Sequence, residues 1–185
     1  MLIRPFLSSD VNAVLKFTDS EIGKGYYSLG ELLKNQKKSV AADDTVCSFL
    51  LVDEPTGEVK GLRLAFPPGH WSHGKGDQQR PDLWPCPIEK TAYFQSLFLS
   101  RDVQGKGWGP KLSQRSIETF KKLGALGIAT HSWLQSPHNS SVKYLEKMGF
   151  KKIIEHPLYW IHVDYVCPLD GKPCRCTAVE MYLTL

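Results

Sequence analysis

Gln104-Gly105-Lys106-Gly107-Trp108-Gly109 is the stretch of this sequence that decides the fold. It follows an apolar segment, residues 91–99, with the composition of a buried strand, and it precedes residues 110–123, whose apolar side chains recur at helical spacing. Glycines let backbone amides approach a ligand without interference from Cβ atoms. Amide hydrogens at a helix N-terminus point toward an anion. The strand, the turn and the helix together therefore predict a cradle for a phosphate group.

Other glycine-rich phosphate motifs do not fit this turn. A Walker-type loop has Lys followed by Ser or Thr after its last glycine, whereas Gly109 is followed by Pro110. A dinucleotide fingerprint starting at Gly105 requires glycine at position 110, and a kinase loop fails at the same place. The motif is therefore either another class of phosphate-binding turn or a glycine-rich turn without a ligand.

The charge distribution agrees with a small phosphorylated ligand. The whole chain carries a formal charge of +4, which is too mild to indicate a nucleic-acid partner. An excess of the same size lies between residues 104 and 122, where one acidic residue, Glu118, faces five basic ones: Lys106, Lys111, Arg115, Lys121 and Lys122.

The turn resembles the Gln/Arg-x-x-Gly-x-Gly/Ala signature of the GCN5-related N-acetyltransferases, the GNAT family. A second match follows in residues 141–150, Ser-Val-Lys-Tyr-Leu-Glu-Lys-Met-Gly-Phe, which are similar to the family's fourth helix and its closing Gly-Phe. The resemblance is strongest over residues 91–156, and the opening Ile3-Arg4-Pro5 is also similar to many members. It implies one GNAT-like domain over residues 1–185. The fold would be α/β, with a mixed, mostly antiparallel sheet that is splayed in the middle and has helices on both faces.

The resemblance also implies acetyl-CoA as co-substrate and assigns residues to it. Backbone groups of Leu97, Phe98 and Leu99, on the splayed strand, would pair with the pantetheine arm. His138 or Asn139, near the start of the fourth helix, would contact CoA, and Lys111 and Arg115 could attract its remaining phosphate. The pyrophosphate would lie on the turn and the helix start, which comprise Gln104, Gly105, Lys106, Gly107, Trp108, Gly109 and Pro110.

The catalytic residues follow the family pattern less closely. Members often carry a Glu on the fourth or fifth strand as general base and a Tyr on the fourth helix as general acid. Here Tyr93 and Trp133 stand at those strand positions, and Leu145 stands at the usual Tyr position. Tyr144, about 100° around the helix from Leu145, is the candidate acid. An aromatic residue there could equally belong to the core.

A general base is needed because an amine with a pKa of about 10.4 costs about 4–5 kcal/mol to deprotonate at pH 7. His131 is the candidate base, acting directly or through water, since its unperturbed pKa suits the task. Glu89 is the alternative. A histidine on a strand could also be a hydrogen-bonded structural residue.

The function expected from these residues is acetyl-CoA-dependent N-acetyl transfer to a primary amine, of a small molecule or a peptide, by direct attack in a ternary complex. A non-catalytic acyl-CoA-binding module is the first alternative, because the usual Tyr and Glu are missing. A thiol- or zinc-dependent interaction protein is the second. The acceptor and the oligomeric state stay open.

Three of the five cysteines, Cys167, Cys174 and Cys176, lie close together in the sequence, in the predicted hairpin over residues 157–185. An odd cysteine count without an export signal argues against a disulfide framework. The three thiols could bind zinc with His156, His162 or Asp170 as fourth ligand, could be redox active, or could be plain turn cysteines. The prediction adopted here is that the chain has no metal site.

The remaining pattern is that of a globular protein. Hydrophobic residues make up 42% of the chain, and apolar runs are too short to span a membrane, so a soluble, cytoplasmic protein without membrane partners is expected. Residues 67–87 hold five of the 12 prolines and predict an irregular loop, which is either a surface insertion or a substrate-facing lid. It contains Trp71 and Trp84, and its histidines, His70 and His73, are either solvated or part of a metal or substrate site. A helix is expected after Ser9-Asp10, and another over residues 28–38 with Leu29, Leu32 and Leu33 as its apolar stripe. A further helix should begin at Ser136-Pro137 and end near Gly149. Strands are expected at residues 2–5, 46–53, 58–66, 128–134, 151–155, 160–166 and 177–183.

Overall fold

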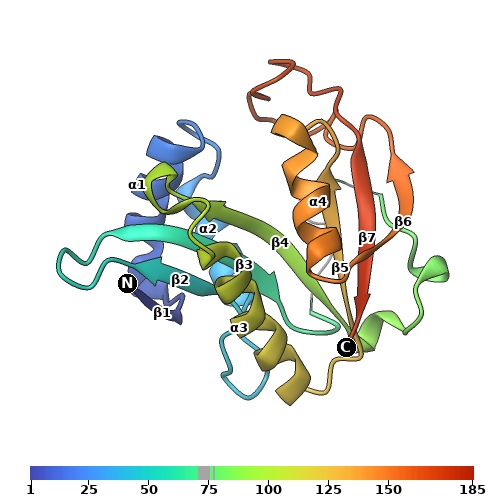
Figure 1. Cartoon of the computed structure of the whole chain (residues 1–185), viewed down its shortest axis with the longest axis horizontal. Helices are drawn as coiled ribbons and strands as arrows, with labels where there is room; N and C mark the ends of the chain where they lie inside the picture. The colour runs from blue at the N-terminus through green and yellow to red at the C-terminus, as the bar shows by residue number, and fades with distance from the viewer. Residues whose placement is uncertain (71–75, 77) are drawn as a thin grey trace.

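Seven strands form one sheet in the order β1-β2-β3-β4-β5-β7-β6 (Figure 1). The computed structural model describes residues 1–70, 76 and 78–185. Among the pairs of named strands, β4 and β5 run parallel and every other pair is antiparallel. The bounds are Leu2–Pro5 for β1, Phe49–Val52 for β2, Val59–Phe66 for β3, Thr91–Leu99 for β4, Gly127–Trp133 for β5, Lys151–His156 for β6 and Ala178–Thr184 for β7.

The sheet splays open between β4 and β5. These strands pair only from Thr91 and Gly127 to Phe94 and Thr130, while β4 continues to pair with β3 as far as Leu99. The register between β3 and β4 shifts at Leu64/Ala65, which leaves Gln95 as an extra residue in β4. Such a bulge bends a strand and increases its local twist. Beyond it, β4 and β5 diverge, as Figure 1 shows.

Two helices cover each face of the sheet (Figure 1). The helices α1 (Val11–Glu21) and α2 (Leu29–Lys38) pack on one face, and α3 (Trp108–Lys122) and α4 (Ser140–Lys147) lie on the other. Successive side chains of a strand point to opposite faces. Accordingly, Leu64 and Phe66 of β3 join the core under α1 and α2, whereas Ala65 joins the core under α3 and α4. This architecture confirms the mixed, mostly antiparallel α/β fold expected from the sequence.

The helix starts differ from the predictions by a few residues. The helix expected from Pro110 begins at Trp108, after Gly107, whose φ of +80° places it in the left-handed region. The helix expected from Pro137 becomes a regular α-helix only at Ser140, because His138 and Asn139 have φ values of 56° and 54°. Both shifts follow from backbone conformations that helical spacing of apolar residues does not report.

Two further expectations were wrong. Residues 160–166 form turns rather than a strand, because the backbone amides of Ile161 and Val163 bond locally to Leu158 and Trp160. The side chains of Trp160 and Tyr165 instead pack against buried cysteines. In α2 only Leu32 is buried among the three leucines of the expected stripe, since Leu29 and Leu33 are 46% and 47% exposed.

The described residues contain no helix that is both long and apolar enough to cross a membrane. The cytoplasmic location stays a prediction. Within the loop at residues 67–87, Trp71 and His73 lie outside the described residues, so the predicted lid is not tested at these positions. Trp84, by contrast, is buried in the core.

Candidate functional site

A cavity of about 1010 Å³ opens where β4 and β5 diverge. Its walls come from the second half of β4, the end of β5, the start of α4, and the turn at Gln104 and Gly105. A further wall comes from the segment between β6 and β7, which contributes Tyr159, Trp160 and Tyr165. The cavity is therefore built from elements far apart in the sequence, which meet only because the sheet splays.

The edge of β4 that faces the cavity is free to bind an extended ligand. Leu97, Phe98 and Leu99 pair with β3 along one edge, and in the described residues no strand pairs with their other edge. All three line the cavity. One acceptor on this edge is already engaged, because Gln104 Nε2 donates to the Leu99 carbonyl at 2.8 Å. This bond also fixes the following turn to the end of the strand.

The glycine-rich turn leaves the N-terminus of α3 open. Gly105 and Gly107 have φ values of 71° and 80°, which L side chains rarely adopt. No atom lies within 4 Å of the position that a Cβ would occupy at either residue. Gln104 and Gly105 line the cavity, whereas the helix start beyond them does not; it comprises Lys106, Gly107, Trp108, Gly109 and Pro110. Amides at such a helix start suit a phosphate at the mouth of the cavity.

The basic side chains near this turn have partners of their own. Lys111 Nζ lies 4.5 Å from the centre of the Trp108 ring, and Arg115 lies 3.5 Å from Glu118. On the other side of the cavity His138 is exposed and Asn139 is half-buried. Neither contributes to the wall, although Pro137, Ser140 and Ser141 beside them do.

Tyr144 reaches the cavity, as the candidate acid must. Its hydroxyl lies 2.7 Å from Ser113 Oγ and 3.2 Å from the Gly109 carbonyl oxygen, so it points toward the start of α3. Leu145 also lines the cavity and is nearly buried. The one-residue offset from the family's usual position therefore does not remove a phenol from this site.

A buried cation, Arg63, lies beside Tyr144. Its guanidinium donates to Ser113 Oγ at 2.7 Å and 3.1 Å and lies 4.1 Å from the centre of the Phe94 ring. Burial lowers the Arg63 pKa, and the nearby Tyr144 opposes that shift. Arg63 also lines the cavity, and among the described residues no carboxylate forms an ion pair with it. It therefore places a positive charge on the wall.

His131 is the centre of a hydrogen-bonded group under the same cavity. Its Nδ1 lies 2.9 Å from the Tyr93 hydroxyl, and its Nε2 lies 3.5 Å from Glu180 Oε2. The ring stacks on Tyr159 with a centroid distance of 4.6 Å and an interplanar angle of 19°. Burial lowers the His131 pKa and outweighs the opposing effect of Glu180. The imidazole is therefore neutral at neutral pH, as a general base must be.

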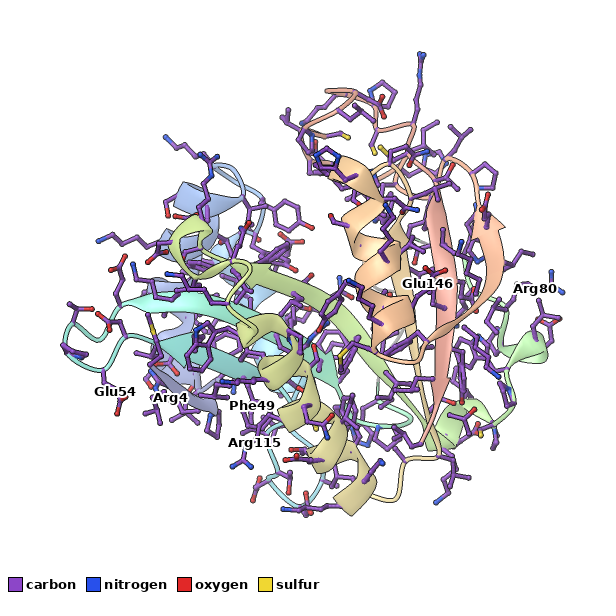
Figure 2. All side chains as sticks on the ribbon, viewed as in Figure 1. Arg4, Phe49, Glu54, Arg80, Arg115 and Glu146 are labelled. Atoms are coloured by element: carbon purple, nitrogen blue, oxygen red, sulfur yellow. The ribbon has the colours of Figure 1, made fainter. Side chains whose placement is uncertain are left out.

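Glu180 is the carboxylate that contacts several members of this group. It is fully buried and accepts hydrogen bonds from the Trp84 indole, from His156 Nε2 at 2.6 Å, and from the backbone amide of Arg80 at 3.0 Å. Figure 2 shows the Arg80 side chain itself directed outward at the edge of the molecule beside β6. Burial raises the Glu180 pKa, but the hydrogen bonds from His131, His156 and Trp84 outweigh that effect and lower it to about 2. The carboxylate is therefore charged and able to stabilise a protonated His131.

The model of the acetyltransferase (GNAT) family matches residues 26–150, well over half of the chain. The chain belongs to the GNAT family. Membership supports acetyl transfer in general, and it confirms the resemblance that the turn and the fourth helix indicated.

A curated relative of this GNAT chain is an uncharacterized N-acetyltransferase, YvbK, from Bacillus subtilis strain 168. The two are 32% identical over 97 residues, which are 52% of this chain. The aligned part spans 61% of that relative's length.

Solved structures of GNAT enzymes share the fold. Naa20 of Chaetomium thermophilum in complex with a bisubstrate analogue has a TM-score of 0.72 and 14% identity, with coverage of 100% of this chain and 87% of that one. The Escherichia coli ribosomal-protein-S18-alanine N-acetyltransferase has a TM-score of 0.69 and 15% identity, with coverage of 99% and 92%. The NatC complex bound to Gag peptide and CoA has a TM-score of 0.69 and 15% identity, with coverage of 100% and 98%. At these identities the likeness shows the fold alone.

Within the GNAT fold, some of the predicted site residues line the cavity and others lie outside its wall. His131 and Tyr144 both line the cavity, whereas Glu89 is exposed in a short turn before β4 and lies outside the wall. Sequence reasoning missed Arg63 and Glu180. A signal for Glu180 was present, because it is the only charged residue in the apolar run of residues 178–183, where an unpaired carboxylate would be costly.

Proposed function

We propose that this chain is an acetyl-CoA-dependent N-acetyltransferase that acts on a primary amine by direct attack in a ternary complex. The observation that carries the proposal is the continuous cavity between β4 and β5, which runs from the glycine-rich turn to the buried His131 group. An elongated cofactor with a phosphate end and a reactive end suits such a cavity. Acetyl-CoA would supply an activated acetyl group as its thioester.

The residues of this chain fit that cofactor. The free edge at Leu97–Leu99 would bond to amides of the pantetheine arm, and the turn from Gln104 to Pro110 would bind the pyrophosphate. His138 or Asn139 would add a contact from the other side. Lys111 and Arg115 remain candidates for the last phosphate, although each already contacts a neighbour.

His131 would accept the proton of the attacking amine. Tyr93 and His131 both line the cavity, and the Tyr93 hydroxyl lies 2.9 Å from His131 Nδ1, so the proton would reach the imidazole through the Tyr93 hydroxyl or a water molecule. Glu180 would then stabilise the imidazolium, as a buried carboxylate orients and stabilises the histidine of other acid–base catalysts. Tyr144 would donate a proton to the departing thiolate.

The cavity wall favours an acceptor that carries an amine on an apolar body. Tyr26, Trp133, Tyr159, Trp160 and Tyr165 contribute aromatic surface, and no Asp or Glu lines the cavity among the described residues. A polycation would lose hydration there without gaining a carboxylate partner. A peptide N-terminus or a small aromatic or aliphatic amine fits the wall better than a polyamine.

The first experiment is calorimetric titration of the purified chain with acetyl-CoA. Gly107→Glu places a negative charge at the predicted pyrophosphate site, and Gly107→Asn is the matched control, because Asn tolerates the left-handed conformation and adds no charge. We expect micromolar binding that Gly107→Glu abolishes and that Gly107→Asn largely keeps. Absence of binding by the unaltered chain contradicts the proposal.

A panel of amines then tests the chemistry, with release of free CoA thiol as the readout. Turnover of at least one amine supports the transferase. Tight binding of acetyl-CoA without turnover over a broad panel supports a non-catalytic acyl-CoA-binding module instead, a reading that the presence of Leu145 at the usual Tyr position would then explain.

A further inference from the structure

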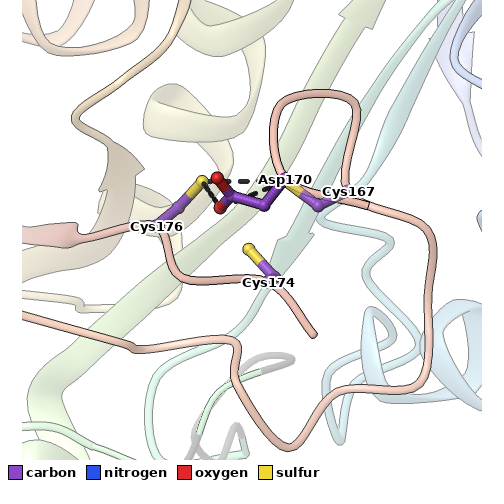
Figure 3. Close-up of side chains that lie close together, drawn as sticks. All are labelled: Cys167, Asp170, Cys174 and Cys176. Carbon is purple, nitrogen blue, oxygen red and sulfur yellow. Dashed lines mark hydrogen bonds between the residues drawn. The ribbon is translucent and has the colours of Figure 1, made fainter. Parts of the chain in front are cut away.

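Four metal-ligating side chains converge in the segment between β6 and β7 (Figure 3). The ligand atoms of Cys167, Asp170, Cys174 and Cys176 all lie within 4.8 Å of one another. The Sγ atoms of Cys167 and Cys176 are 3.6 Å apart, and Asp170 Oδ2 lies 3.3 Å from the Cys176 sulfur. The three cysteines are at most 3% exposed. From this arrangement we propose that the four residues form a zinc site, contrary to the absence of metal predicted from the sequence.

The spacing between the ligand atoms suits tetrahedral zinc. Zinc–sulfur bonds of about 2.3 Å at tetrahedral angles place two sulfur atoms about 3.8 Å apart. The distance of 3.6 Å between Cys167 and Cys176 is close to this value. Three thiolates select zinc over magnesium or calcium, which prefer oxygen ligands, and Asp170 completes the four positions of a closed site.

The backbone brings the ligands together in two pairs. Cys167 and Gly171 exchange two backbone hydrogen bonds of 2.9 Å, and Gly171 has a φ of 74°, so residues 167–171 form a tight turn. This turn presents Cys167 and Asp170 at the three-residue separation of a Cys-x-x-Cys pair, with a carboxylate in place of the second thiol. Cys174 and Cys176 approach from the irregular segment that leads into β7.

Contacts around the ligands support the same arrangement. The Tyr165 hydroxyl donates to Cys174 Sγ at 3.2 Å, and the backbone amide of Arg175 donates to Asp170 Oδ2 at 2.8 Å. Hydrogen bonds of this kind orient metal ligands and tune their charge. The two histidines considered with these cysteines lie elsewhere, since His156 is bonded to Glu180 and His162 is exposed. Asp170 is therefore the fourth ligand.

The site lies directly behind one wall of the cavity. Trp133, Trp160 and Tyr165 pack against the three cysteines, and all three also line the cavity. Trp133 ends β5, but Trp160 and Tyr165 lie in turns rather than in a strand, so the local backbone alone does little to hold these two side chains in the wall. Zinc, on replacing the thiol protons, would fix the turns and with them the surface that receives the amine.

Metal analysis of the full chain, purified without chelator, tests the proposal without any activity assay. We expect close to one zinc per chain. Replacement by Co²⁺ should give the visible absorption of tetrahedral cobalt and the near-ultraviolet band of thiolate ligation. Cys174→Ser should reduce zinc content at least tenfold, while the control Cys86→Ser, a half-buried cysteine outside the cluster, should leave it unchanged.

Three results would overturn the proposal. These are absence of both bound zinc and the cobalt spectrum, a Cys167–Cys176 disulfide found by mass spectrometry of unreduced protein, and full zinc content in Cys174→Ser. If Cys174→Ser does not fold, the cobalt titration of the unaltered chain decides alone. Zinc content and acetyl-CoA affinity are separate measurements, so failure of this proposal is distinguishable from failure of the proposed function.

Discussion

At the residue scale, the proposed general base consists of two side chains, His131 and Glu180. His131 lines the cavity beside Tyr93 and is kept neutral by burial, while Glu180 is kept charged by its hydrogen bonds and does not line the cavity. A neutral imidazole next to a fixed carboxylate can accept a proton without leaving a positive charge unpartnered in the interior. In the proposed mechanism the pair would do what a strand Glu does in other members of the family.

Replacement of His131 by Gln should lower kcat about 10²- to 10⁴-fold, because positioned general bases contribute factors of that size. Acetyl-CoA affinity should not change, since His131 belongs to the acceptor side of the cavity. The measurement is kcat against pH. The acidic limb of the unaltered enzyme, set by a His131 pKa below its usual range, should disappear in the variant.

His156→Gln is the matched control, as His156 bonds to the same carboxylate but does not line the cavity. Full turnover by His131→Gln with an intact pH profile would rule out the base role.

Replacement of Glu180 by Gln should keep the shape of the group and remove its charge. His131 then loses the carboxylate that stabilises its protonated form, so we expect kcat to fall and the acidic limb to move to lower pH. The check is the pH profile, because a purely structural loss would lower the rate without moving the limb. A lower rate with an unmoved limb would make Glu180 structural only.

At the element scale, α4 presents Tyr144 to the start of α3. The hydroxyl contacts Ser113, which also accepts from Arg63, so the phenol belongs to a polar connection between β3, α3 and α4.

Tyr144→Phe should reduce kcat ten- to a hundredfold if the phenol protonates the thiolate, and Kd for acetyl-CoA should change little. The steady-state rate of thiol release gives kcat, and calorimetric titration gives Kd for acetyl-CoA. Ser113→Ala is the control, since it removes the hydrogen-bond partner and keeps the phenol. Unchanged kcat in Tyr144→Phe would assign the residue to packing.

The elements that could be predicted from the sequence are those whose cause is local. The strand at Thr91–Leu99, the turn with Gly105 and Gly107, and α3 lie next to one another in the chain, and spacing and glycine content suffice to find them. Residues 160–166 alternate like a strand, but their aromatic side chains pack against cysteines up to 16 positions away, and the turns that allow this have no local signal. Glu180 differs in that its charge inside an apolar run is a local signal, but its partners Trp84 and His156 come from other segments and could not be found locally.

At the scale of the whole molecule, the splayed sheet brings together three groups of residues that lie far apart in the sequence. The glycine-rich turn, the His131 group and the aromatic side chains packed on the cysteine cluster all border one cavity, which opens where β4 and β5 separate. The side chains of His131 and Glu180 are only 2% and 0% exposed. Protonation of this buried pair should therefore affect folding as well as catalysis.

Stability should fall as the solution is acidified below about pH 6.5. His131 has a lowered pKa in the fold, so below its ordinary value of 6.5 the unfolded chain binds a proton that the folded chain does not. Glu180 adds to the loss between its ordinary pKa of 4.5 and its folded value of about 2, a difference worth about 3 kcal/mol when complete. Both shifts have the same sign, because each group is stabilised in its deprotonated form.

Urea unfolding of the unaltered chain at a series of pH values should show a plateau above about pH 7 and a steady decline below it. Glu180→Gln, compared at the same pH values, should start from a lower plateau and decline less steeply below about pH 4.5, because the carboxylate that titrates there is gone. A free energy of unfolding that stays constant between about pH 7 and about pH 4 would show that the histidine–glutamate group does not couple folding to protons.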